Sequence, residues 1–330
     1  CGSSRVLPHV ASDAAQPPAA AYEPRFIALP DMKAHKRFPR AGSAEDFAHP
    51  ITGQPNMLQL LKKKSDFDAD STCFIFVSHR WLRPGNGAKG HPDDDNNSKY
   101  KLLLKMIEEL QAGAASPIPE NFKVALWVDF CCIDQDTDPG DELNHLHSII
   151  QGCDLILTPV VDPRHAEWLK PGEQGKLVDS WFVDYKAPAW QDYLKRAWCR
   201  VEMMIASNYE VADRARGALF RGALKAAIQG GRRPHVIFGD KELATNAQVI
   251  FLEPLMHSNF DEYAPEKGQL TNEADRPTIA KLSERTRAKM VKLAVGFAEG
   301  FPYRGGVGSG RGKKVYANGD EYEGEWKDGM

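Results

Sequence analysis

The stretch Cys73-Phe74-Ile75-Phe76-Val77-Ser78 is apolar over the length of a β-strand and turns polar only at its last residue. A strand with one solvated face alternates apolar and polar side chains, whereas an uninterrupted apolar run is typical of a strand covered on both faces. Strands of a parallel sheet between two layers of helices are buried in this way. The run therefore predicts a central strand of an α/β domain.

Similar runs alternate with helical patterns along the chain. We predict further strands at residues 124–130, 155–161 and 235–238. Helices are predicted where apolar residues recur at intervals of three and four, at residues 99–112, 142–152, 189–207, 218–228 and 278–299. This alternation indicates βαβ units and a mainly parallel sheet, in which ligands bind beyond the carboxyl ends of the strands. That rule selects residues 78–81, 131–135 and 159–162.

The two ends of the chain differ in composition from its middle. Residues 1–45 are rich in Ala, Pro and Ser, and we interpret residues 1–65 as a flexible leader before an α/β domain at residues 66–300. Residues 301–330 begin with a glycine-rich linker. The start at Cys1 without Met and the stop at Met330 indicate a fragment or a processed form. A preceding Met-Gly would create an acylation signal, M-G-C-G-S-S.

Composition excludes several classes of protein. The 330 residues are 42% hydrophobic and 26% charged, and the net charge of −3 predicts no attraction to nucleic acid. No run approaches the roughly 20 apolar residues of a transmembrane helix, and no secretory signal opens the chain, so we expect a cytoplasmic protein. The six cysteines form no CxxC pair, which favours buried reduced thiols over a zinc site or a redox dithiol.

A carboxylate on one helix is the first candidate for chemistry. In Ala197-Trp198-Cys199-Arg200-Val201-Glu202, the glutamate lies about 40° from Trp198 on a helical wheel, at the border of the apolar stripe. Partial desolvation there raises the pKa of Glu202 and makes it a candidate acid, base or charge stabiliser. The alternative is a rim glutamate paired with a neighbouring Arg or Lys.

Aspartates near the second predicted strand are a weaker signal. Asp129, Asp134 and Asp136 suggest either a magnesium site or a polar loop with capping aspartates, and we favour the loop and predict no metal. Trp127 and Asp129 are two residues apart and would point to the same face of a strand, toward the pocket. Residues 83–98 form a long loop, in which we interpret Asp93-Asp94-Asp95 as solvated.

Four motifs together resemble a TIR-like domain. They are Phe76-Val77-Ser78-His79-Arg80-Trp81, Trp127-Val128-Asp129, the run from Cys153 to Pro159, and Trp198-Cys199-Arg200-Val201-Glu202, in the expected order. The stretch from Trp127 to Gln135 also resembles the W-I/V-D-x-x-C-I-D/N-Q signature of heterokaryon-incompatibility (HET) domains. The resemblance covers residues 70–210 and implies a flavodoxin-like fold. The long loop at residues 83–98 and a long insertion before the Glu202 helix depart from the TIR pattern.

The resemblance implies a reaction and a site. Catalytic TIR domains cleave the nicotinamide–ribose bond of NAD with a glutamate in a W-C-x-x-E helix, which is Glu202 here. A carboxylate stabilises or traps the oxocarbenium-like ribose that forms. Trp81 or Trp198 would stack on the nicotinamide ring, and the donors Ser78, His79 and Arg80 would hold ribose or phosphate. NAD would be a substrate, with no resident cofactor.

Self-association is expected in either of two functions. TIR enzymes commonly complete their active site between protomers, and many TIR domains only assemble, so a non-catalytic scaffold is the alternative. The tail supports docking, because Tyr322, Gly324, Trp326 and Gly329 match the Y-x-G-x-W-x-x-G of MORN repeats. That resemblance implies a β-hairpin that begins a stacked array, and docking to membrane or cytoskeleton.

Overall fold

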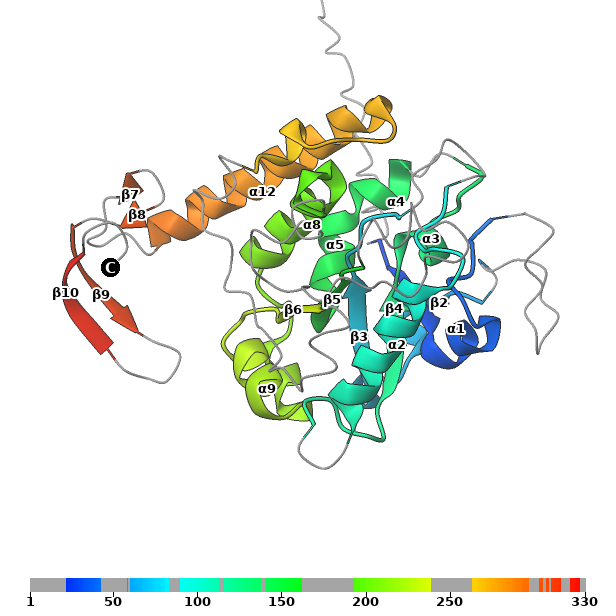
Figure 1. Cartoon of the computed structure of the whole chain (residues 1–330). Helices are drawn as coiled ribbons and strands as arrows, with labels where there is room; N and C mark the ends of the chain where they lie inside the picture. Colours follow the sequence, from blue (N-terminus) through cyan, green and yellow to red (C-terminus); the bar gives the residue numbers. More distant parts are fainter. Residues whose placement is uncertain are drawn as a thin grey trace, which may run out of the picture.

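A computed structural model gives the arrangement of the chain (Figure 1). It describes residues 22–42, 58, 60–82, 90–112, 116–137, 140–161, 193–238 and 263–296, together with short strands at 303–304, 307–308, 310–315 and 321–326.

The centre of the molecule is a six-stranded mixed sheet in the order β2-β1-β4-β3-β5-β6. Its strands are β1 (Arg25–Ala28), β2 (Lys62–Lys63), β3 (Thr72–Val77), β4 (Lys123–Trp127), β5 (Leu155–Pro159) and β6 (His235–Phe238). The pairs β3–β4, β3–β5 and β5–β6 are parallel, whereas β1 is antiparallel to both β4 and β2. Every residue of β3 is buried, which confirms a central strand in a mainly parallel α/β sheet.

Helices separate the parallel strands. They are α1 (Leu29–His35), α2 (Ser98–Gln111), α3 (Asp129–Cys132), α4 (Gly140–Asn144), α5 (Leu146–Gln151), α8 (Ala197–Asn208), α9 (Gly222–Gln229) and α12 (Arg276–Gly296). Short 3₁₀ helices include η5 (Arg214–Leu219), η6 (Pro265–Lys267) and η7 (Glu273–Asp275). Helix α8 packs between α5 and α12 (Figure 1). Near the carboxyl end, β9 (Gly310–Val315) and β10 (Glu321–Trp326) form an antiparallel pair.

The prediction of a leader through residue 65 is wrong for its described part. Phe26 and Ile27 of β1 are fully buried, and so are Met32 of α1 and Phe38 after it. Strand β1 pairs with β4 and covers the edge of the parallel strands. Four residues among prolines and alanines are too short to show a period, so composition hid this strand. Residues 1–21 and 43–57 lie outside the described part.

Three predicted elements differ from the structure in their bounds or continuity. The second strand ends at Trp127, and residues 129–132 form α3, in which the Phe130 amide donates to the Asp129 carboxylate at 2.6 Å. The helix carrying Glu202 starts at Ala197, since Arg196 is extended (φ −81°, ψ 130°). The helix predicted at 142–152 is two helices, interrupted at His145.

The aspartates before α2 are buried, so their interpretation as a solvated loop is wrong for Asp93 and Asp94. Asp93 accepts from the backbone amides of Lys99 and Tyr100, each at 2.8 Å. Asp94 accepts from the amide and hydroxyl of Ser98. The first turn of a helix leaves amides without partners, and Asn97 before it is left-handed (φ 54°) and provides no side-chain cap. The two aspartates supply the missing acceptors.

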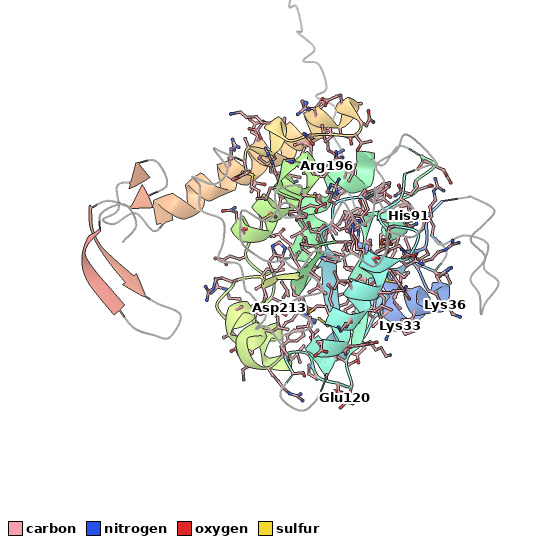
Figure 2. All side chains as sticks on the ribbon, in the orientation of Figure 1. Lys33, Lys36, His91, Glu120, Arg196 and Asp213 are labelled. Carbon is pink, nitrogen blue, oxygen red and sulfur yellow. The ribbon has the colours of Figure 1, made fainter. Side chains whose placement is uncertain are left out.

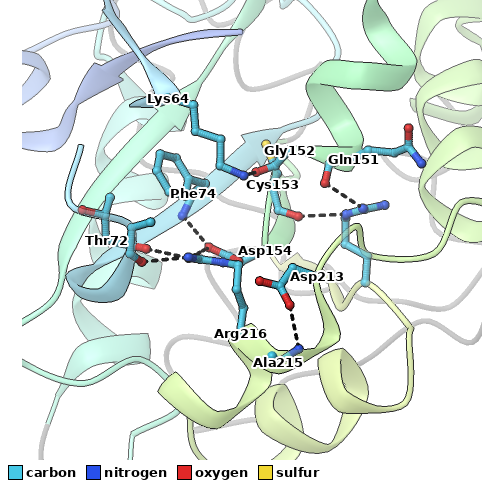
Figure 3. A network of polar contacts seen from close by, with 12 residues as sticks. Lys64, Thr72, Phe74, Gln151, Gly152, Cys153, Asp154, Asp213, Ala215 and Arg216 are labelled. Carbon is cyan, nitrogen blue, oxygen red and sulfur yellow. Dashed lines mark hydrogen bonds and ion pairs between the residues drawn. The ribbon is translucent and has the colours of Figure 1, made fainter. Parts of the chain in front are cut away.

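An ion pair joins the amino ends of β3 and β5 (Figure 3). The Asp154 carboxylate accepts from the Phe74 amide at 2.9 Å and from Arg216 Nε and Nη2 at 2.7 and 2.9 Å. Arg216, on η5, also donates to the carbonyls of Thr72 and Ala69. The side chains of Arg216 and Asp154 are 12% and 5% exposed, so water contributes little to their solvation. Their bidentate pairing offsets the cost of burying both charges.

Asp154→Ala should destabilise the fold strongly. The substitution leaves Arg216 buried without its counter-ion and the Phe74 amide without its acceptor, which predicts a loss of about 3–5 kcal/mol in the free energy of unfolding. Urea denaturation of both proteins measures this difference. The matched control is Arg214→Ala, two residues before Arg216, which breaks an exposed ion pair with Glu210 and should cost no more than about 0.5 kcal/mol. Equal losses in the two variants would contradict the assignment.

Candidate functional site

The candidate site lies where the order of the strands reverses. From β3 the chain crosses to β4 on one side and then returns to β5 on the other, so the carboxyl ends of β3 and β5 border a switch point, where ligands of open α/β sheets bind. The Ser78 amide donates to the Leu157 carbonyl at 3.0 Å and continues the pairing of the two strands. His91 and Arg196 lie at this end of the domain, and Glu120, which precedes β4, lies at the other (Figure 2).

Glu202 extends from α8 to the end of β3. Its Oε2 accepts a hydrogen bond from Ser78 Oγ at 2.5 Å, and the side chain is partly buried. Burial raises the pKa of Glu202 well above its usual value, the Ser78 hydrogen bond lowers it, and Asp129 raises it further. Within the described residues, no Arg or Lys forms an ion pair with Glu202. The structure therefore favours a desolvated carboxyl group over a rim glutamate in an ion pair.

A second carboxylate has the opposite electrostatic character. Trp81 Nε1 donates to Asp129 Oδ2 at 2.8 Å, and the buried His79 ring approaches Oδ1 to 3.2 Å without the alignment of a hydrogen bond. Burial raises the pKa of Asp129, but the adjacent His79 and the hydrogen bonds from Trp81 and the Phe130 amide outweigh it, so the pKa falls below its ordinary value. Two neighbouring carboxyl groups with pKa values shifted apart are suited to different roles in one reaction.

The three predicted tryptophans separate in the structure. Trp81 is partly exposed, with its edge against Phe130. Trp127 is buried and stacks on Phe76 with ring centroids 4.8 Å apart, so it belongs to the core and does not face the site with Asp129 as predicted. Its strand ends there, and Asp129 belongs to the helix that follows. Trp198 is partly exposed, and its Nε1 donates to Asp275 of η7 at 3.0 Å.

Arg80 leads to a residue that sequence reasoning missed. Its carbonyl accepts from the Nζ of Lys99, which also donates to the Pro92 carbonyl at 2.7 Å. Burial lowers the pKa of Lys99 to about 8, although the nearby Asp93 raises it. A lysine in the first turn of a helix normally faces solvent, so its burial could not be predicted from the residues around it. A water-sized recess is lined by Arg80, Leu82, Lys99, Pro159, Val160, Val161 and Tyr193.

Tyr193 is the second residue that was missed. Its hydroxyl lies 2.5 Å from Ser78 Oγ, and the side chain is buried. Tyr193 falls on the apolar stripe of the predicted helix at 189–207, where it resembled a core residue. Because a buried tyrosine hydroxyl generally has a hydrogen-bond partner, that position could have been flagged as polar, although the partner could not be named.

The aspartates considered for magnesium have separate partners. Asp136 pairs with Arg40 at 2.5 Å, and Asp134 accepts the Asp136 amide at 2.9 Å. Asp129 faces His79 and Trp81 instead. The described residues contain no group of three or more His, Cys, Asp or Glu side chains placed to hold a metal ion. Asp134 thus accepts a loop amide as the favoured interpretation expected, whereas Asp136 is in an ion pair and Asp129 belongs to α3.

Comparison with known proteins found no similar family, protein or structure. No family model matches the chain, and no curated protein and no solved structure matches it. In the described part of the chain, every helix is too short or too polar to span a membrane. Fold and site together define an α/β protein with a buried polar site at the switch point of its sheet.

The titration of Glu202 should move in opposite directions in two variants. Ser78→Ala removes a hydrogen bond to the carboxylate and should raise the pKa of Glu202, whereas Asp129→Asn removes a negative charge and should lower it. The measurement is a ¹³C NMR titration of the full chain with glutamate labelled at Cδ. The Glu202 signal is identified by its loss in Glu202→Gln. Shifts of the same sign in both variants would contradict this electrostatic description.

Proposed function

We propose that this protein is a TIR-like NAD glycohydrolase with Glu202 as its catalytic carboxylate. The observation that carries the proposal is the Glu202 carboxyl group, desolvated and held by Ser78 at the β3–β5 switch point. The fold adds support. Counted from β3, the four parallel strands have the order 2-1-3-4, which agrees with a flavodoxin-like sheet.

The reaction would break the bond between C1′ of the ribose and the nicotinamide nitrogen. The electron pair of that bond leaves with nicotinamide, and the ribose becomes an oxocarbenium-like cation that water attacks, giving ADP-ribose, nicotinamide and a proton. Ionised Glu202 would stabilise the cation, and its desolvation strengthens this attraction. Trp81 or Trp198 would stack on the nicotinamide ring, and Arg80 would hold a phosphate.

A scaffold is the second candidate, and two observations favour it. The Glu202 carboxylate already has an internal partner in Ser78, and the adjacent recess is water-sized. Strands β9 and β10 also pair as the hairpin of a MORN repeat would, with Tyr322 opposite Lys314. In this function the α/β domain self-associates in the cytoplasm, and the repeats dock it to membrane or cytoskeleton.

Replacing Glu202 by Gln should abolish NAD cleavage. Loss of the charge that stabilises the cation predicts a fall in kcat of about 100-fold or more. The assay follows nicotinamide release by chromatography for the full chain, at high protein concentration with a crowding agent to favour assembly. The matched control is Glu210→Gln, an exposed residue two positions beyond α8, which should retain the wild-type rate.

Either of two results would refute the enzyme. Cleavage that survives in Glu202→Gln would assign the chemistry to another residue. An absence of cleavage by folded, demonstrably assembled wild-type protein would favour the scaffold.

The pH dependence of cleavage should follow the ionisation of Glu202. Only the ionised carboxylate stabilises the cation, so kcat/KM should rise with pH through a midpoint above 4.5, because burial raises the pKa of Glu202. Ser78→Ala should move this midpoint higher, since the Ser78 hydrogen bond lowers that pKa. Initial rates at subsaturating NAD across pH give both midpoints. If Ser78→Ala leaves the midpoint unchanged, the rise of kcat/KM with pH reports the ionisation of a group other than Glu202.

A further inference from the structure

A chain of buried polar side chains leads from Glu202 across two strands. Ser78 Oγ lies 2.5 Å from both Glu202 Oε2 and the Tyr193 hydroxyl. The Thr158 side chain of β5 lowers the pKa of Tyr193, as a hydroxyl that donates toward the phenol oxygen would. Thr158 Oγ1 in turn lies 2.8 Å from Nε2 of His235 on β6. Five side chains from separate parts of the sequence thus form one continuous polar series.

Counting hydrogens gives this series a direction. Ser78 has one hydroxyl hydrogen, and the carboxylate of Glu202 can only accept it, so the Tyr193 hydroxyl must donate to Ser78. Tyr193 then has only acceptor capacity left for Thr158, which must donate to it. Thr158 therefore accepts from His235, and this assigns the hydrogen of the neutral imidazole to Nε2. Every donor points toward Glu202.

The surroundings keep both distant groups in the required forms. The exposed fractions are 1% for Ser78, 3% for Tyr193, 0% for Thr158 and 5% for His235, so water does not compete along the series. Burial raises the pKa of Tyr193 well above its usual value, and the phenol keeps the hydrogen that it donates. Burial also lowers the pKa of His235 to about 3, so the imidazole is neutral at neutral pH.

We propose that Tyr193, Thr158 and His235 are positioning residues that fix the Ser78 hydroxyl as a donor to Glu202 and thereby favour the ionised carboxylate. Hydrogen bonds aligned in one direction polarise one another, so the last bond, to Glu202, is strengthened by the others. The consequence for NAD cleavage rests on the proposed function, whereas the effect on the charge of Glu202 does not.

Other groups near Glu202 also influence its pKa. Among the described residues, those that interact electrostatically with it are Asp129 of α3, Cys199 on α8 itself, Tyr193 and Ser78. Asp129 opposes the ionisation of Glu202, and the Ser78 hydrogen bond favours it. The series from His235 therefore acts through the one favourable contact.

The test compares Tyr193→Phe with Tyr100→Phe in the ¹³C titration of Glu202. Tyr193→Phe removes only the hydroxyl that donates to Ser78, and it should lower the acid dissociation constant of Glu202 roughly three- to tenfold. Thr158→Val should change it in the same direction by less. Tyr100 is also buried, and its hydroxyl faces the Met32 carbonyl instead, so Tyr100→Phe should leave the titration of Glu202 unchanged.

A second measurement needs no variant. At a pH where the ¹³C titration shows Glu202 to be ionised, the ¹⁵N shifts of His235 in the full wild-type chain should show hydrogen on Nε2, and a hydrogen on Nδ1 would break the direction of the series and overturn the proposal. An unchanged Glu202 titration in folded Tyr193→Phe would overturn it as well. Neither readout depends on turnover. Absence of NAD cleavage would thus refute the proposed function alone, whereas normal cleavage without these signatures would refute the positioning series alone.

Discussion

The burial of β3 on both faces is the constraint on which the rest of the structure depends. A strand without a solvated face must be covered from both sides of the sheet, and β3 also pairs along its two edges with β4 and β5. Asp154 fixes its amino end by accepting the Phe74 amide, and the Leu157 carbonyl fixes its other end by accepting the Ser78 amide. Ser78 is therefore held beside β5 by backbone pairing, before any side chain of the site contributes.

Much of the sheet could be predicted, because deep burial leaves a plain signal. The four parallel strands are predominantly apolar runs, and all four were located from that feature. Strand β1 was not located, since a strand of four residues shows too little pattern to stand out from its proline- and alanine-rich surroundings. Asp93 and Asp94 were misread for a related reason. Composition marks such residues as polar, but only the fold shows that the amides of α2 need their oxygens.

The residues of the candidate site also differ in whether local sequence patterns could reveal them. Glu202 could be predicted, because a helical wheel places it at the border of an apolar stripe and the motif agrees. Trp127 could not be excluded, because its inward or outward direction depends on where the strand ends. Tyr193, Thr158 and His235 were beyond reach for another reason. Their partners lie between 35 and 115 positions away in sequence, which no local pattern can reveal.

The burial of the Glu202 carboxyl group lowers the stability of the fold, and this cost is an argument about the role of the group. A carboxyl group that is desolvated, close to a second carboxylate and supported by a hydroxyl contributes less to the packing of α8 than an apolar side chain of similar volume would. Buried carboxyl groups with shifted pKa values are enriched at functional sites. Two carboxyl groups at one switch point best complement a cation, because a positive charge between them would favour the ionised form of both. NAD carries that charge on its nicotinamide ring and transfers it to the ribose as the bond breaks, so the electrostatics of the site match the proposed substrate both before and during the reaction.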